Sequence, residues 1–167
     1  FLCNFMGMKR DIYGKLLEWK GSKRRKPLML KGARQTGKTY IVREFGKREY
    51  ENLLYFNFEE DPKLEGFFSE NLKPASIIEN LSIYIGRKIR PPIDLIFFDE
   101  IQVSNNALNS LKYFEEQAND FHIVAAGSLL GVKLSTPKSF PVGKVNFLDL
   151  TPMTFLEFLD AVGKSEY

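Results

Sequence analysis

Cysteine and histidine are almost absent from this sequence of 167 residues, which contains one of each. Cys3 therefore has no partner for an intramolecular disulfide, and the chain lacks the ligands for a Cys/His metal site. Long apolar runs are also missing: none approaches the roughly 18 residues that a membrane-spanning helix needs, and residues 1–7 lack the charged start of a signal peptide. We expect a cytoplasmic protein without a membrane partner.

A strong excess of charge is missing too, because 24 basic residues stand against 21 acidic ones and leave a formal net charge of +3. Such a balance neither implies nor excludes a nucleic-acid partner. A chain of 167 residues that is 44% hydrophobic is long enough for one domain with a sizeable core and too short for two. We interpret residues 1–7 as an extension and residues 8–167 as that domain.

Five short apolar stretches predict β-strands, and the segments between them predict helices. The strands are expected over residues 28–31, 53–58, 95–99, 123–126 and 145–150. Helical spacing or a capping pair predicts helices over residues 10–20 and 107–116, after Ser76 with Glu79, and after Thr154 with Glu157. Strands that alternate with helices favour a parallel sheet covered on both faces.

The segment LKGARQTGKTY, residues 30–40, has the spacing of a phosphate-binding loop, with Gly32, four residues, and then Gly37, Lys38 and Thr39. Glycines allow successive N–H groups to turn inward around an anion, and the helix expected from Lys38 adds the partial positive charge of its N-terminus. Lys38 would reach the β- and γ-phosphates of a nucleotide, and the Thr39 hydroxyl would complete a magnesium site. The residues expected to contact the nucleotide are Gly32, Ala33, Arg34, Gln35, Thr36, Gly37, Lys38, Thr39 and Tyr40.

A pair of acids, Asp99 and Glu100, follows the apolar stretch LIFF at the carboxyl end of its predicted strand. Open α/β sheets bind ligands at this edge. Asp99 would hold the magnesium ion, and Glu100 would polarise a water molecule for attack on the γ-phosphate. The alternative is a strand followed by two solvated acids, which the preceding phosphate loop makes the weaker interpretation.

A further apolar strand ends at Gly127 and Ser128. Ser128 would position the attacking water if this strand lies beside the strand of the phosphate loop; otherwise the serine begins the next turn. The expected catalytic residues are thus Lys38, Glu100 and Ser128. His122, at the other end of the strand, is expected to be structural or exposed and not a ligand.

Several segments together resemble the uncharacterised AAA-type ATPases of bacteria and archaea that carry a C-terminal domain of unknown function. They are the phosphate loop, FFDEIQ, GSLLG and SFPVGKVNFLDLTPMTFLEFL, and the resemblance extends from about residue 8 to residue 163. It implies a P-loop NTPase fold, a three-layer α/β/α sandwich with a parallel five-stranded sheet in the order 5-1-4-3-2. It also implies that ATP and Mg²⁺ are bound, and that ATP hydrolysis is coupled to the C-terminal domain.

Two departures from this group affect the expectations. The chain ends before the helical lid and second sensor arginine that AAA ATPases usually add, so the lid and the C-terminal domain are expected to be absent from it, and the isolated chain to be weakly active or inactive. The arginine finger is unassigned: Arg34, Arg87 and Arg90 are candidates by charge, and Lys144 stands where relatives often have an arginine.

Two other functions stay open on the sequence. The basic run of residues 20–26 is interpreted as a solvated linker, but it would also suit a module that binds DNA or protein without appreciable hydrolysis. A small-molecule kinase would use the same phosphate loop, although no arginine-rich lid is recognisable. An oligomer of the full-length protein is a further alternative to a monomer.

Overall fold

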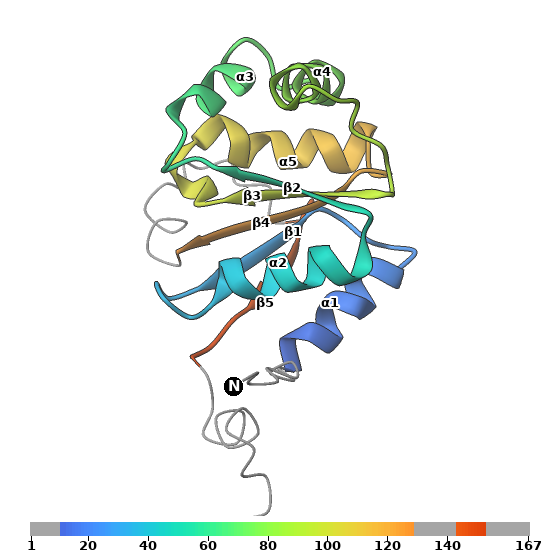
Figure 1. Ribbon diagram of the computed structural model, residues 1–167, viewed down its shortest axis with the longest axis vertical. Helices are drawn as coiled ribbons and strands as arrows, with labels where there is room; N and C mark the ends of the chain where they lie inside the picture. Colours follow the sequence, from blue (N-terminus) through green and yellow to red (C-terminus); the bar gives the residue numbers. More distant parts are fainter. Residues whose placement is uncertain (1–10, 129–142, 153–167) are drawn as a thin grey trace, which may run out of the picture.

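A computed structural model describes residues 11–128 and 143–152 of the chain. At its centre lies a sheet of five parallel strands in the order β2-β3-β4-β1-β5 (Figure 1). The strands are β1 (Leu28–Gly32), β2 (Asn52–Asn57), β3 (Asp94–Asp99), β4 (His122–Ser128) and β5 (Asn146–Asp149). This is the predicted order 5-1-4-3-2 read from the opposite edge, so the predicted topology is confirmed.

Helices cover both faces of the sheet and complete the predicted three-layer sandwich (Figure 1). One face is covered by α1 (Asp11–Gly21) and α2 (Lys38–Glu49); the other is covered by α3 (Gly66–Ser69), α4 (Pro74–Ile85) and α5 (Asn105–Gln117). Two 3₁₀ turns, η1 (Pro62–Glu65) and η2 (Ile101–Val103), follow β2 and β3. No helix within residues 11–128 or 143–152 combines the length and the apolar character needed to cross a membrane.

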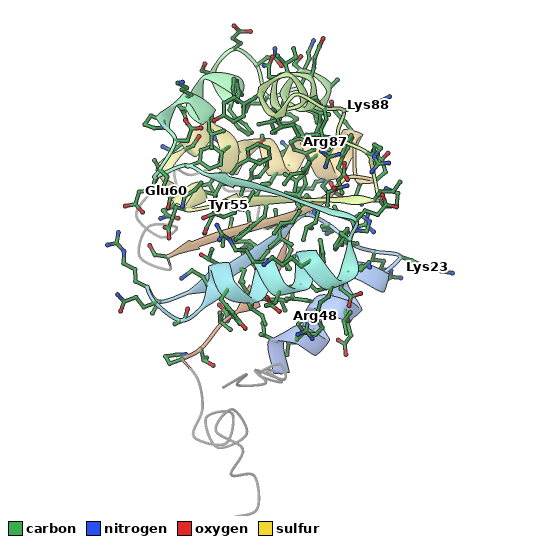
Figure 2. The ribbon with its side chains drawn as sticks, in the orientation of Figure 1. Lys23, Arg48, Tyr55, Glu60, Arg87 and Lys88 are labelled. Carbon is green, nitrogen blue, oxygen red and sulfur yellow. The ribbon has the colours of Figure 1, made fainter. Side chains whose placement is uncertain are left out.

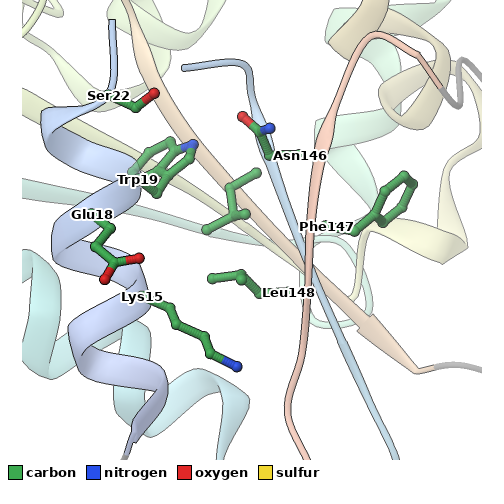
Figure 3. Close-up of a pocket in the computed structure, with 8 residues that line it drawn as sticks. Lys15, Glu18, Trp19, Ser22, Asn146, Phe147 and Leu148 are labelled. Carbon is green, nitrogen blue, oxygen red and sulfur yellow. The ribbon is translucent and has the colours of Figure 1, made fainter. Parts of the chain in front are cut away.

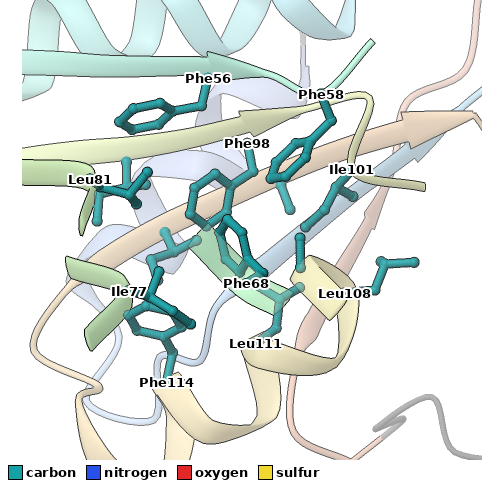
Figure 4. Packing of buried hydrophobic residues seen from close by; sticks show 14 of the residues in the cluster. Phe56, Phe58, Phe68, Ile77, Leu81, Phe98, Ile101, Leu108, Leu111 and Phe114 are labelled. Atoms are coloured by element: carbon teal, nitrogen blue, oxygen red, sulfur yellow. The ribbon is translucent and has the colours of Figure 1, made fainter. Parts of the chain in front are cut away.

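Two clusters of buried side chains fill the spaces between the sheet and its helices. The cluster beneath α3, α4 and α5 contains Phe68 and Phe98 (Figure 4). The cluster beneath α1 and α2 contains Trp19, Phe45 and Phe97. The neighbours Phe97 and Phe98 enter different clusters because successive side chains of a strand point to opposite faces. This two-sided burial explains why β3 is apolar along its middle instead of alternating with polar residues.

The start of α4 differs from its sequence signal. The helix begins at Pro74, with Lys73 as the N-cap residue and no side-chain hydrogen bond to the cap. The capping box predicted from Ser76 and Glu79 is therefore wrong. Proline suits this position because its fixed φ is already helical and its missing N–H would have no partner in the first turn.

The helix predicted over residues 107–116 is α5, which begins two residues earlier. Its N-cap is Ser104, whose side chain accepts a hydrogen bond from the Ala107 N–H at 3.0 Å. The helix predicted after Thr154 with Glu157 lies outside the described residues, and so does the extension of residues 1–7.

The histidine of the chain is buried at the start of β4, at the end of the sheet away from the phosphate loop. His122 Nδ1 lies 2.7 Å from the Tyr50 hydroxyl, and the rings of Tyr50 and Trp19 meet the imidazole edge to face. Burial lowers the pKa of His122 from 6.5 to about 4, with the nearby charges of Arg25 and Lys20 acting in the same direction. The structure thus gives His122 a packing role as a neutral imidazole.

We expect His122 to make the stability of the protein depend on pH. Between pH 6.5 and about 4 the unfolded chain binds a proton that the native imidazole resists, so acidification through this range lowers the free energy of unfolding. The expected loss is roughly 1–3 kcal/mol, after a discount for solvent access. Urea unfolding of the wild type and His122→Gln at pH 7 and pH 4.5 measures it. The carboxylates titrate in both proteins, so only the difference between them reports on His122. If the free energy of unfolding changes equally with pH in both, this assignment is contradicted.

Candidate functional site

Two residues of the loop between β1 and α2 have left-handed backbone conformations. Gln35 has φ = 62° and Gly37, the N-cap residue of α2, has φ = 88°. Such residues allow successive N–H groups of a loop to converge on one point, which makes an anion-binding concavity. Glycine is favoured at position 37 because residues that carry a side chain rarely adopt this backbone conformation.

Gly32 closes the strand side of the loop and lies tightly against the end of β5. A Cβ atom at this position would come 2.5 Å from the carbonyl oxygen of Leu150 and 3.0 Å from Thr36 Oγ1. The backbone of Leu150 is itself tied to β1, since its N–H donates to the Lys31 carbonyl at 2.7 Å. Gly32 is therefore required by space, and β5 fixes where the loop begins.

Lys38, the first residue of α2, is buried at the mouth of this loop. Its Nζ donates hydrogen bonds to the carbonyl oxygens of Gly32 at 3.0 Å and Ala33 at 2.6 Å. Burial lowers the pKa of Lys38, and the negative charges of Glu100 and Asp99 oppose that shift. These hydrogen bonds of the ammonium group go to backbone carbonyl oxygens, and the phosphate oxygens of a ligand bound in the loop could take their place as acceptors.

Asp99, the last residue of β3, is buried and accepts three hydrogen bonds. The Thr39 hydroxyl donates to Asp99 Oδ2 at 2.7 Å, and the Tyr55 hydroxyl donates to the same oxygen at 3.0 Å. The backbone N–H of Glu100 donates to Oδ1 at 3.0 Å. The two predicted metal-binding residues, Thr39 and Asp99, are thus in direct contact although 60 positions separate them in the sequence.

The pair of Thr39 and Asp99 suits a magnesium ion. Mg²⁺ prefers oxygen ligands and usually keeps several waters, so one or two protein oxygens and the phosphates of a nucleotide suffice. Within residues 11–128 and 143–152 no group of three or more His, Cys, Asp or Glu side chains is placed to hold a metal by itself. A hydroxyl and a carboxylate at the mouth of a phosphate loop are the donor set expected for a metal shared with a nucleotide.

A cleft of about 460 Å³ opens at this edge of the sheet. Its lining residues are Arg34, Gln35, Gly37, Lys38, Thr39, Tyr40, Glu59 and Glu100. Asp99 lies beneath this surface, in contact with Thr39. Ser128, the last residue of β4, pairs in register with Gly32 on the adjacent strand, so β4 runs between the strands of Lys38 and Asp99 as expected.

Tyr55 of β2 contacts Asp99, and Asn57 contacts Tyr55; no pattern in the sequence indicates either residue. Besides its bond to Asp99, the Tyr55 hydroxyl accepts a hydrogen bond from Asn57 Nδ2 at 3.1 Å, and the Arg43 guanidinium lies 4.2 Å from the Tyr55 ring centre. Burial raises the pKa of Tyr55, which keeps its phenol protonated as a donor. In the sequence these residues look like ordinary positions of a strand; the signal becomes visible once β2 is known to pair with β3, with Asn57 opposite Asp99.

Two of the arginine-finger candidates lie elsewhere. Arg87 and Arg90 contact Asp94, the first residue of β3, at 3.2 Å and 3.8 Å, so they are at the opposite end of that strand from Asp99 (Arg87 is labelled in Figure 2). Arg34 lines the cleft. Lys144 forms ion pairs with Glu115 and Glu116 of α5 and does not line the cleft.

The basic run of residues 20–26 is partly used to tie the fold together. Lys20 pairs with Glu49 of α2, Arg25 donates to the Asn119 carbonyl at 2.7 Å, and Lys26 Nζ donates to the Gly143 carbonyl at 2.6 Å. Lys23 and Arg24 are exposed, and Lys23 extends away from the fold (Figure 2). The run therefore connects α1 to β1 as an anchored linker.

A second cavity, of about 430 Å³, lies between α1 and β5 (Figure 3). Its apolar lining residues are Trp19, Leu28, Phe147 and Leu148, and Lys15 and Glu18 line it from α1. None of the predicted site residues lines it. The chemistry of the phosphate loop and the acids therefore belongs to the cleft at the carboxyl edge and not to this cavity.

The phosphate loop after β1, the strand order and the acids at the end of β3 define an AAA-type P-loop ATPase fold. The sequence profile of the AAA domain family matches residues 24–159, and the chain belongs to this family. It is a nucleotide-binding module of the AAA ATPase type. No curated protein matches the sequence significantly.

Among solved structures, the chain is similar to the Orc1 protein of Aeropyrum pernix, whose structure was determined in complex with DNA. The identity is 15% and the TM-score 0.55, and the match covers 92% of this chain and 47% of the Orc1 chain. At this identity the likeness concerns the fold. The chain thus spans about half the length of that protein.

Proposed function

We propose that this domain hydrolyses ATP to ADP and phosphate with magnesium, and that in the full-length protein the reaction drives or switches a C-terminal domain. The observation that carries the proposal is the contact between the Thr39 hydroxyl and the Asp99 carboxylate at the mouth of the phosphate loop, with Glu100 lining the same cleft. This combination supplies a phosphate cradle, a metal site and a base in one place. The reaction is assigned to the cytoplasm.

Each group has a defined task in this proposal. The loop from Gly32 to Tyr40 binds the phosphates, and Lys38 neutralises the β- and γ-phosphate oxygens. Thr39 and Asp99 would hold magnesium, which when bound would supply charge stabilisation for the phosphates. Glu100 takes a proton from a water molecule that Ser128 helps to position. The water oxygen bonds to the γ-phosphorus while the bond from that phosphorus to the β–γ bridging oxygen breaks, which leaves ADP and inorganic phosphate.

Product analysis tests the reaction class. The full-length protein is incubated with ATP and Mg²⁺ without any acceptor, and released phosphate is followed alongside ADP. Hydrolysis produces the two in equal amounts, and Asp99→Asn should suppress both. A small-molecule kinase would form little ADP without an acceptor. With an acceptor it would form ADP while the phosphoryl group passes to that acceptor and not to water, and this result would replace the proposal with the kinase alternative.

DNA binding is the alternative that the exposed Lys23 and Arg24 favour, and the Orc1 structure is a complex with DNA. Because Lys20, Arg25 and Lys26 are already in contact with the rest of the fold, we propose that the run contributes at most a weak, salt-dependent contact. Fluorescence anisotropy with duplex DNA over a range of salt concentrations, for the wild type and a Lys23→Ala, Arg24→Ala variant, measures it. Tight binding that this variant loses would make DNA a principal ligand.

We expect the Tyr55 hydroxyl to contribute to metal-dependent binding of ATP through Asp99. Tyr55→Phe removes one of the two side-chain donors to Asp99 Oδ2 and leaves the ring in place. We expect affinity for ATP in the presence of Mg²⁺ to fall by roughly 3- to 10-fold, the range of one net hydrogen bond. Calorimetry with Mg²⁺ and with a chelator measures the metal-dependent part. An equal loss under both conditions would mean that Tyr55 acts on the nucleotide or on the fold, and not through Asp99.

A further inference from the structure

The backbone between Asp99 and Ser104 is fixed at three points. Asp99 belongs to β3, Ile101 is fully buried in the cluster beneath α5, and Ser104 caps α5. Glu100 and Gln102 are the alternate residues of this segment, and both are only half-buried. The sequence DEIQ thus divides into residues that hold the turn and residues whose side chains are available for another task.

Glu100 adopts a backbone conformation that side chains other than glycine rarely use, with φ = 52° and ψ = 38°. A left-handed conformation of this kind costs of the order of 1 kcal/mol, and such residues concentrate at functional sites. It lets β3 pass directly into η2 while the Glu100 side chain lines the cleft. The backbone therefore sets the direction in which the Glu100 side chain leaves the chain. It does not set the side-chain torsions that orient the carboxylate.

Gln102 supplies a contact that fixes them. Its Nε2 donates a hydrogen bond to Glu100 Oε2. Since an ionised carboxylate can only accept, the amide nitrogen must face Glu100, and the amide oxygen must face away. That oxygen is buried and has no hydrogen-bond partner within the described part of the chain. A glutamine with a purely structural role would be expected to satisfy both of its polar ends, so the unpaired oxygen indicates that the bond to Glu100 decides its orientation.

We propose that Gln102 is a positioning residue for Glu100 in ATP hydrolysis, an inference that rests on the proposed function. The Gln102 amide holds Oε2 and restricts rotation of the carboxylate, so that Oε1 is left to accept the proton of the attacking water. Positioning a base in this way raises the rate because misplacement of a reacting group is costly. It should have no direct effect on nucleotide binding, because the proposed function places the phosphates in the loop and not at η2.

Steady-state ATP hydrolysis by the full-length protein tests this role. Gln102→Met keeps the length of the side chain and removes the donor, and we expect kcat to fall roughly 10- to 100-fold with KM nearly unchanged, the range for a hydrogen bond to a charged group. Gln102→Glu keeps the shape but places a negative charge against Glu100, and its kcat should be lower still. Melting temperatures show which of the two variants is folded, and either one is sufficient for the test.

A double-mutant cycle separates positioning from structure. If Gln102 acts only through Glu100, Gln102→Met should have no further effect on kcat in a Glu100→Gln background. A full additional loss there, or a change in KM without a change in kcat, would overturn the proposal. Turnover that depends on Glu100 but is unaffected by Gln102→Met overturns the role of Gln102 alone. Absence of turnover in the wild type, or turnover that Glu100→Gln leaves unchanged, contradicts the proposed function itself.

Discussion

Lys38→Ala is expected to abolish measurable binding of magnesium ATP, with a loss of affinity of at least about 100-fold. The side chain is buried at the loop, its ammonium group bonds the carbonyl oxygens of Gly32 and Ala33, and no other cation of the loop is placed so deeply. Removal of its charge leaves the β- and γ-phosphate oxygens without their charged donor. Each hydrogen bond between charged groups changes a binding affinity by roughly several-fold to a hundredfold. Isothermal titration calorimetry of the wild type and the variant measures the change.

Lys47→Ala is the matched control, because Lys47 lies in the last turn of the same helix, α2, and is exposed. It should bind ATP like the wild type. The melting temperature of Lys38→Ala in the absence of nucleotide shows whether the loop has kept its structure. Undiminished affinity in a folded Lys38→Ala protein would mean that the nucleotide binds away from this loop.

Glu100→Gln is expected to separate binding from catalysis. The substitution keeps the shape of the side chain and removes its ability to take a proton, so ATP should bind about as well as in the wild type while turnover falls by roughly 10²-fold or more. Single-turnover hydrolysis in the full-length protein, beside an equilibrium binding measurement, shows both effects. The different position of Asp99, buried and bonded to Thr39, predicts that Asp99→Asn instead weakens binding of the metal and nucleotide together.

Glu59→Gln provides the control for charge in the cleft, since Glu59 lines it from the turn after β2 without any predicted role in the chemistry. Its turnover should stay close to that of the wild type. Wild-type turnover in Glu100→Gln would falsify the role of Glu100 as the base. Loss of binding in that variant would instead make Glu100 a structural or metal-binding residue.

The contact between Thr39 and Asp99 was predictable because two motifs indicate positions at the same edge of the sheet. A phosphate loop follows the carboxyl end of its strand, Asp99 ends another strand, and in a parallel sheet these ends meet on one side. The strand order itself came from the resemblance to AAA ATPases and not from apolar patterns, which do not show which strands are neighbours. The structure confirms that order and places β4 between β1 and β3.

Contacts that depend on tertiary neighbours were not predictable from local patterns. Tyr55 contacts Asp99 only because β2 pairs with β3. The bond from Gln102 to Glu100 is local, but it depends on the left-handed backbone of Glu100 and on η2 directly after it, which the sequence pattern does not show. The need for Gly32 to lack a side chain comes in part from Leu150, which β5 brings to the loop from far along the chain. At α4 two local signals competed, and a proline in the first turn determined the start of the helix.

The most direct measurement is a crystal structure of the protein with a non-hydrolysable ATP analogue and Mg²⁺. The predicted result has the β- and γ-phosphates within the loop from Gly32 to Thr39, the Lys38 ammonium on their oxygens, and the metal at the Thr39 hydroxyl beside Asp99. The analogue bound in another cavity, such as the one between α1 and β5, or a metal ion distant from both Thr39 and Asp99, would contradict the account.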